Sequence, residues 1–326
     1  MYEVELKMKE RAKELLESGE VARVIGWKKG EFYHDPAPAT FESVSELDSF
    51  VYNGFCGANL SKYLIKLGKL EGKTAIFMKP CDSFSFNQLV KEHRVVRENV
   101  LVIAIECQGK LNVEKIKEKG YTAISEVEEK GDEVVVKSLY GDGTVAKDEV
   151  LLGKCETCKS KVHQVKDEEI ILNEMREGKK ERFAEVEKLE KMTEDERFAF
   201  WRGQLQKCIR CNACRNVCPA CSCLKCVFDN PASGVAAKAN DDKFEEQLFH
   251  VIRAFHVAGR CTDCGECSRV CPQNIPLHLL NRKYIKDIDN LYGAFQAGES
   301  AEGKTPLTSY TEGDTEPNDV FNGEAK

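Results

Sequence analysis

The chain has 326 residues, a hydrophobic content of 42%, a charged content of 32% and a formal net charge of −7 at pH 7. This length accommodates two domains, and the composition is ordinary for a soluble globular protein. The acidic balance argues against a surface for nucleic acid or anionic membranes. The first residues are charged and lack an apolar signal segment, and the longest aliphatic run, residues 100–105, is too short to cross a bilayer. We therefore expect a cytosolic protein.

The N-terminal region, residues 1–166, alternates helical and strand patterns. Helices are predicted over residues 4–16, 58–67 and 83–93. The runs TAIFM (74–78) and VLVIAI (100–105) predict short buried strands, and EVVVK and TVAKDEVLL predict an antiparallel pair. This alternation predicts an α/β domain with a partly parallel sheet. The sequence contains no GxGxxG motif after a strand and no GxxxxGKS/T motif, so no nucleotide site is assigned.

The remaining chain divides into three segments. Residues 167–203 are rich in Glu, Lys and Arg and contain no proline, which predicts one or two linking helices. Residues 204–292 are expected to be mainly α-helical between cysteine clusters, with an apolar stripe of Phe244, Leu248, Val251 and Phe255 on a helix over residues 242–258. Residues 293–326 have little apolar content, which predicts a disordered tail.

Cysteine is the residue that carries most information. Sixteen cysteines in a cytosolic chain favour metal ligation over disulfides, because cytosolic thiols stay reduced. If the metal is iron in iron–sulfur clusters, an anaerobic or well-protected setting follows. The cysteines are unevenly distributed, with five in the first 165 positions and eleven between Cys208 and Cys271.

The strongest pattern is a doubled CxxCxxCxxxCP motif. Three thiolates at every third residue can wrap one face of a 4Fe–4S cluster, while the fourth cysteine points toward a second cluster. Crossed ligation of this kind gives cluster one to Cys208, Cys211, Cys214 and Cys271, and cluster two to Cys261, Cys264, Cys267 and Cys218. The alternative is a pair of zinc sites, but zinc does not need a doubled four-cysteine pattern with its prolines. We therefore expect two ferredoxin-type clusters.

Three further cysteines, Cys221, Cys223 and Cys226, follow the first motif in PACSCLKC. They are either small buried residues and free thiols, or ligands of another cluster whose fourth ligand comes from elsewhere. We favour the ligand interpretation, with Cys56 as the leading fourth ligand. His250 and His256 lie on the helix between the motifs, where we expect a packing or surface role rather than ligation.

The N-terminal cysteines predict a separate site. Cys81 follows the TAIFM strand, Cys107 follows the VLVIAI strand, and Cys155 and Cys158 form a CxxC at the end of the same region. Because the carboxyl ends of parallel strands meet at one edge of a sheet, these cysteines can converge. Each alone is more often a buried core cysteine, but together they favour a cluster.

Two family resemblances follow from these segments. GRCTDCGECSRVCPQNIPLHLL resembles the helical dicluster ferredoxin modules of respiratory and heterodisulfide-reductase-type subunits. MKPCDSFSFNQL, VIAIECQG and GKCETC resemble the beta subunits of the deazaflavin-coenzyme hydrogenase and formate dehydrogenase family, over roughly residues 50–165. The second resemblance implies an α/β domain that binds FAD and a 4Fe–4S cluster, with Cys81, Cys107, Cys155 and Cys158 at the matching positions.

The preferred interpretation is an iron–sulfur electron-transfer subunit of a cytosolic complex, with a formate dehydrogenase, a hydrogenase or a heterodisulfide-reductase-like assembly as partner. The alternative is a flavin-containing subunit that exchanges hydride with a deazaflavin coenzyme or NAD(P)H. In that case Asn59, Lys62 and Lys79 are candidates, by position only, for contacts to FAD. A helix cap and surface lysines are the simpler interpretations of these residues.

Overall fold

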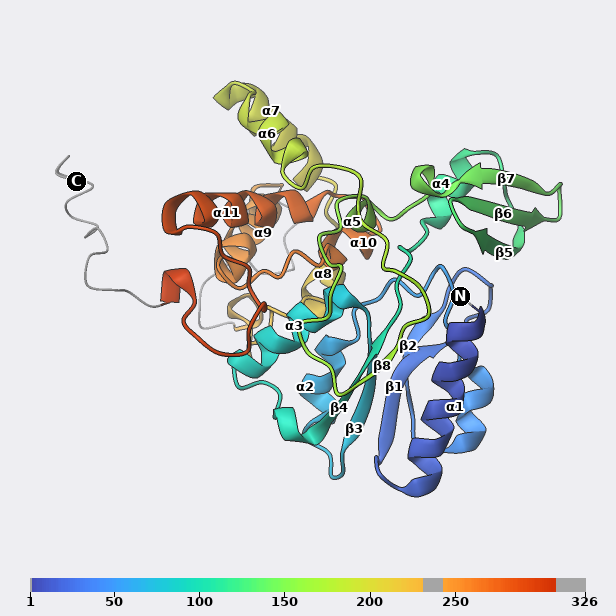
Figure 1. Cartoon of the computed structure of the whole chain (residues 1–326). Coiled ribbons are helices and arrows are strands. Elements are labelled where there is room, and N and C mark those ends of the chain that lie inside the picture. The colour runs from blue at the N-terminus through green and yellow to red at the C-terminus, as the bar shows by residue number, and fades with distance from the viewer. Residues whose placement is uncertain (1, 231–242, 309–326) are drawn as a thin grey trace.

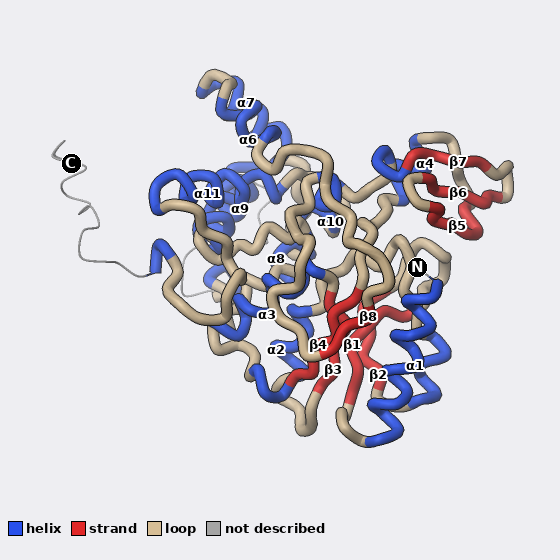
Figure 2. Tube along the Cα trace, viewed as in Figure 1, coloured by secondary structure: helices blue, strands red, loops and turns tan. Residues whose placement is uncertain are grey.

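The computed structural model describes residues 2–230 and 243–308. Its N-terminal part is built on a five-stranded sheet in the order β2-β1-β3-β4-β8. β1, β3, β4 and β8 are parallel neighbours, and β2 is antiparallel at one edge. The predicted α/β region with a partly parallel sheet is confirmed, and so is the mainly helical C-terminal region (Figures 1 and 2).

The element bounds are as follows. The strands are β1 Arg23–Lys28, β2 Ala37–Phe41, β3 Thr74–Met78, β4 Val100–Ile105, β5 Ile124–Lys130, β6 Glu133–Ser138, β7 Gly143–Ala146 and β8 Glu168–Ile170. The helices before the first motif are α1 Tyr2–Ser18, α2 Leu64–Leu67, α3 Pro80–Lys91, α4 Val113–Glu118, α5 Gly153–Glu156, α6 Ala184–Glu190 and α7 Glu194–Leu205. Those from the first motif onward are α8 Ala213–Asn216, α9 Lys243–Val257, α10 Glu266–Arg269 and α11 Leu277–Tyr292.

The N-terminal core forms around the central strands of the sheet. Every residue of β3 and β4 is buried, as expected for parallel strands covered on both faces. The amphipathic helix α1 buries one side, on which Val4, Met8, Ala12 and Leu15 recur at helical spacing. β5, β6 and β7 form a separate antiparallel sheet that lies away from the five-stranded one (Figure 1).

Several sequence predictions need correction. The helix expected over residues 58–67 consists of a short 3-10 turn, Ser61–Tyr63, followed by α2. TVAKDEVLL was expected to be one strand, but β7 ends at Ala146 and a 3-10 turn follows. The segment 167–203 contains the expected helices α6 and α7, but also β8, which pairs with β4. The domain boundaries at residues 166, 203 and 292 stay a prediction.

The apolar stripe on α9 faces outward rather than into the core. Phe244, Val251 and Phe255 are 67%, 39% and 59% exposed. The buried side of the helix carries the polar residues His250 and Arg253 together with Phe249, Ala254 and Val257. This side faces the cysteine motifs, so its interior mixes apolar side chains with polar groups and thiols.

Residues 293–308 are not a disordered tail. Ala297 is buried, and Gly298 lies so close to Phe84 of α3 that an added Cβ would be 1.8 Å from its carbonyl oxygen. Gln296 accepts hydrogen bonds from Lys159 and Arg182. The rest of the predicted tail, residues 309–326, lies outside the described residues. Within the described ranges, no helix is long and apolar enough to cross a membrane.

Candidate metal centres

Cysteines from the first motif converge with the last cysteine of the second. One cavity is lined by the thiol-bearing residues Cys208, Cys211, Cys214 and Cys271. Cys271 comes from the second motif, 57 positions after Cys214 in the sequence. The group matches the crossed ligand set predicted for cluster one.

The second motif gathers Cys218 from the first. Cys218 acts electrostatically on Cys261, Cys264 and Cys267, raising the pKa of each thiol in addition to the larger effect of burial. Burial, with a smaller contribution from Cys218, raises the pKa of Cys261 to about 12 and that of Cys267 to about 11. Thiols with such pKa values are neutral at pH 7, and metal ligation would deprotonate them.

Both motifs use the same backbone path. The residue two positions after the first cysteine has a left-handed conformation, with φ of 48° at Arg210 and 58° at Asp263. The residue after the second cysteine is also left-handed, with φ of 62° at Asn212 and 67° at Gly265. These turns direct backbone N–H groups toward sulfur, as where Arg210 N donates to Cys208 Sγ at 3.3 Å. A loop that presents both thiols and N–H groups suits an iron–sulfur cluster.

Buried ion pairs hold the second motif in place. Asp263 accepts from Arg182 at 2.7 Å and from Arg282 at 3.0 Å. Burial alone would raise the pKa of Asp263, but the two guanidinium groups hold it below its usual value. Glu266 binds Lys154 and Arg269 in the same way, and these cations hold its pKa well below the usual range against the effect of burial.

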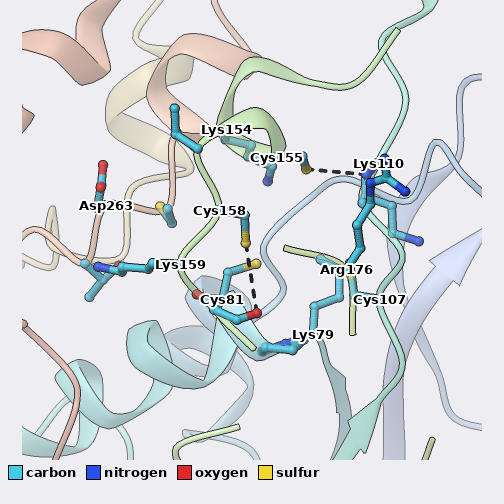
Figure 3. Close-up of a pocket in the computed structure, with 16 residues that line it drawn as sticks. Lys79, Cys81, Cys107, Lys110, Lys154, Cys155, Cys158, Lys159, Arg176 and Asp263 are labelled. Atoms are coloured by element: carbon cyan, nitrogen blue, oxygen red, sulfur yellow. Dashed lines mark hydrogen bonds between the residues drawn. The ribbon is translucent and has the colours of Figure 1, made fainter. Parts of the chain in front are cut away.

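The four N-terminal cysteines also share a cavity. Cys81 lies in the first turn of α3, after β3, Cys107 follows β4, and Cys155 and Cys158 lie in and after α5. Figure 3 shows the Cys81 and Cys158 side chains directed into the same space. Burial raises the pKa of Cys155 to about 12, and it raises the pKa of Cys81 well above its usual value. The convergence expected from strand ends is therefore present.

This N-terminal cavity is rich in cations. Lys79, Lys110, Lys154, Lys159 and Arg176 all line it. Lys110 is buried, lies 3.8 Å from the centre of the Tyr52 ring and donates to Asn53 O at 3.0 Å. Lys154 lowers the pKa of Cys81, Cys155 and Cys158 against the larger effect of burial, and so favours the thiolate form that a cluster requires.

The N-terminal cavity reaches the second motif. Cys264 and Asp263 line it together with Cys81 and Cys158. Lys154 bridges the two sites, because it lies beside Cys81 and Cys155 and is paired with Glu266 of the second motif. The cysteine sites thus follow one another from the N-terminal cavity, through the second motif, to the first.

Cys56 does not join Cys221, Cys223 and Cys226. It is fully buried in the N-terminal core, and its thiol contacts Val51 O and Asn53 Oδ1 at 3.7 and 3.6 Å. The predicted grouping of Cys56 with the other three cysteines is therefore wrong. The sequence shows that these cysteines lie outside the two motifs, but it does not show in which part of the fold each one is buried.

Cys221, Cys223 and Cys226 lie in three different settings. Cys221 lies beside Cys218, Cys223 is exposed, and Cys226 lies next to Arg215. The segment is anchored through its backbone, because Lys62 donates to Cys221 O and Arg94 donates to Ser222 O.

The three residues proposed for flavin contacts have protein partners. Asn59 Nδ2 donates to Ser85 Oγ at 2.8 Å, and its Oδ1 accepts from Ser61 N at 3.0 Å. Lys62 donates to Cys221 O. Lys79 is not a surface lysine: it is 1% exposed, donates to Ala58 O at 2.7 Å and forms an ion pair with Asp82 at 2.8 Å.

Sequence reasoning missed the polar side of α9. His250 is 1% exposed and neither of its ring nitrogens has a hydrogen-bond partner among the described residues, although it lines the first-motif cavity. Cys208, Glu246 and His250 place possible ligand atoms within 4.8 Å of one another. His250 is thus a buried polar side chain that lines the first-motif cavity without a hydrogen-bond partner among the described residues. The polar positions 246, 250 and 253, spaced at helical intervals, were the signal available in the sequence.

Comparisons with known proteins agree with this geometry. Residues 204–275 match the 4Fe–4S dicluster domain family. The chain is 24% identical over 338 residues to the beta subunit of an F420-dependent formate dehydrogenase of Methanocaldococcus jannaschii, covering 86% of this chain and 88% of the relative. A corresponding subunit of Methanococcus maripaludis is 26% identical over 277 residues, covering 66% of this chain and 72% of the relative.

The chain is a homologue of these beta subunits and carries a 4Fe–4S dicluster domain. The chain also matches the protein named putative ferredoxin-3 of Sinorhizobium fredii, with 36% identity over 73 residues that span 22% of this chain and 70% of that protein. The family resemblance seen in the sequence is confirmed. The homology spans both the α/β region and the dicluster region.

Proposed function

We propose that the chain is the iron–sulfur electron-transfer subunit of an oxidoreductase complex, with three 4Fe–4S clusters. Two are held by the crossed cysteine sets of the dicluster domain, and the third by Cys81, Cys107, Cys155 and Cys158. A bound 4Fe–4S cluster supplies one-electron transfer. The observation that carries the proposal is the shared cavity of the N-terminal cysteines and Cys264, which makes the N-terminal site and the second motif neighbours.

The chain's own residues provide what such a subunit needs. Buried cations favour thiolate at the N-terminal cysteines, and the ion pairs of Asp263 and Glu266 fix the second motif. At the other end of the series, Cys211 is exposed and its neighbour Ile209 is 60% exposed. We propose that a partner protein exchanges electrons at this exposed end, because both formate dehydrogenase relatives are named as subunits.

The state of the cysteines supports a location in the cytoplasm. None of the sixteen cysteines forms a disulfide, which suits a reducing compartment such as the cytoplasm. A flavin-containing subunit that exchanges hydride with a diffusible carrier is the second candidate, supported by homology to coenzyme-dependent formate dehydrogenase subunits. The contacts of Asn59, Lys62 and Lys79 with protein groups do not favour it.

The test is the content of iron, acid-labile sulfide and flavin in protein purified without oxygen. We expect about twelve irons per chain, and about eight in the variant Cys158→Ser. Cys56→Ser is the matched control, since Cys56 lies in the N-terminal core, and it should keep the wild-type iron content.

Zinc without iron would contradict the proposal, and so would about eight irons unaffected by Cys158→Ser. About sixteen irons would restore a fourth cluster near Cys221, Cys223 and Cys226. One flavin per chain would favour the second candidate.

A further inference from the structure

Arg253 is a buried cation between the two cysteine motifs. It lies near the end of α9 and is 4% exposed. Its Nε and Nη1 atoms have no hydrogen-bond partner in the part of the chain that the structure describes. A guanidinium group buried in this way costs several kcal/mol unless negative charge compensates it.

The thiols around Arg253 come from both crossed sets. It acts on Cys214 of the first set, on Cys218 and Cys267 of the second, and on Cys221. Its guanidinium group contacts the Cys267 and Cys221 side chains through hydrogen bonds. The cation therefore faces both proposed cluster sites at once.

Three other buried cations near the dicluster cysteines are neutralised by carboxylates. Arg210 pairs with Glu246 at 2.6 Å, Arg282 pairs with Asp263, and Lys154 pairs with Glu266. Arg253 forms no ion pair with a carboxylate among the described residues. Its positive charge is thus left for the thiolates themselves.

We propose that Arg253 is a positioning residue shared by both clusters of the dicluster domain, holding thiolates of the two sets and raising the reduction potential of both centres. The inference rests on the proposed function, because it requires clusters at both sites. A positive charge and N–H donors close to cluster sulfur stabilise the reduced state more than the oxidised state. One residue between two centres moves both potentials in the same direction.

The experiment compares reduction potentials in wild type, Arg253→Met and Arg253→Lys, measured by redox titration with electron paramagnetic resonance on the full chain. Iron per chain is measured in parallel. We expect Arg253→Met to keep its iron and to lower the potentials of two of the three centres. Arg253→Lys should lower them less, because the charge remains while the planar donors are lost.

Arg23→Met is the matched control, because Arg23 is also buried but binds Glu71 O and Thr74 in the N-terminal core. It should leave all potentials unchanged. Unchanged potentials in an iron-loaded Arg253→Met would overturn the inference, and so would equal shifts in all three centres. Loss of iron from both Arg253 variants would also overturn it, because the residue would then be needed for folding. Wild type without iron would instead refute the proposed function.

Discussion

The two cysteine motifs share one backbone path but lie in different surroundings. Left-handed residues occupy equivalent positions in both, and a short helix, α8 or α10, carries the third cysteine of each motif. Around the second motif, Asp263 and Glu266 are buried in ion pairs with cations from distant segments. Around the first motif, Cys211 is exposed. The comparison teaches that a repeated sequence determines the local backbone geometry. Contacts with residues from distant segments determine which copy of the motif is buried and which is exposed.

The largest expected effect separates the two copies by removing one ligand from each. Cys211→Ser and Cys264→Ser should each lose about four irons per chain. Only Cys264→Ser should also alter the resonance signal of the N-terminal centre, because Cys264 lines that cavity. Iron analysis with electron paramagnetic resonance on both variants tests this. Equal changes in the N-terminal signal would break the proposed order of the sites.

The sequence allows a ligand set to be predicted for the dicluster domain because most of its cysteines are local. In each motif three cysteines lie within seven residues, so spacing alone defines the turn. The crossed fourth ligand was predicted from the ferredoxin pattern, and the structure places Cys271 with the first set. The N-terminal convergence was accessible too, since Cys81 and Cys107 follow neighbouring parallel strands.

What could not be predicted depends on tertiary contacts. Cys56 was the leading candidate for a fourth ligand beside Cys221, Cys223 and Cys226, but it is buried in the N-terminal core. The apolar residues of α9 were clear in the sequence, yet Phe244 and Phe255 face outward while His250 and Arg253 face inward. Hydrophobic periodicity assumes an apolar interior. That assumption holds only in part for α9, which buries His250 and Arg253 beside Phe249, Ala254 and Val257.

The next prediction tests how much the buried ion pairs of Asp263 stabilise the second motif. Asp263→Asn preserves the left-handed backbone, which Asn tolerates, but leaves Arg182 and Arg282 without their shared carboxylate. Breaking a buried ion pair of this kind costs about 3–5 kcal/mol. We expect a loss of that size in the free energy of unfolding, measured with guanidinium chloride and circular dichroism under anaerobic conditions. An exposed pair such as Lys13 with Glu17 provides the control, since Glu17→Gln should change stability by less than about 1 kcal/mol.

The smallest effect tests the shared backbone itself by exchanging the residues after the second cysteine of each motif. Asn212 and Gly265 have nearly the same φ, but a Cβ added at Gly265 would be 2.5 Å from Lys154 Cβ. Gly265→Asn should therefore cost about 1–3 kcal/mol through overpacking. Asn212→Gly should change stability by less than about 1 kcal/mol, because Gly adopts this conformation without strain but loses more entropy on folding. If the two exchanges lower the free energy of unfolding equally in guanidinium chloride, the contact with Lys154 does not distinguish the two motifs.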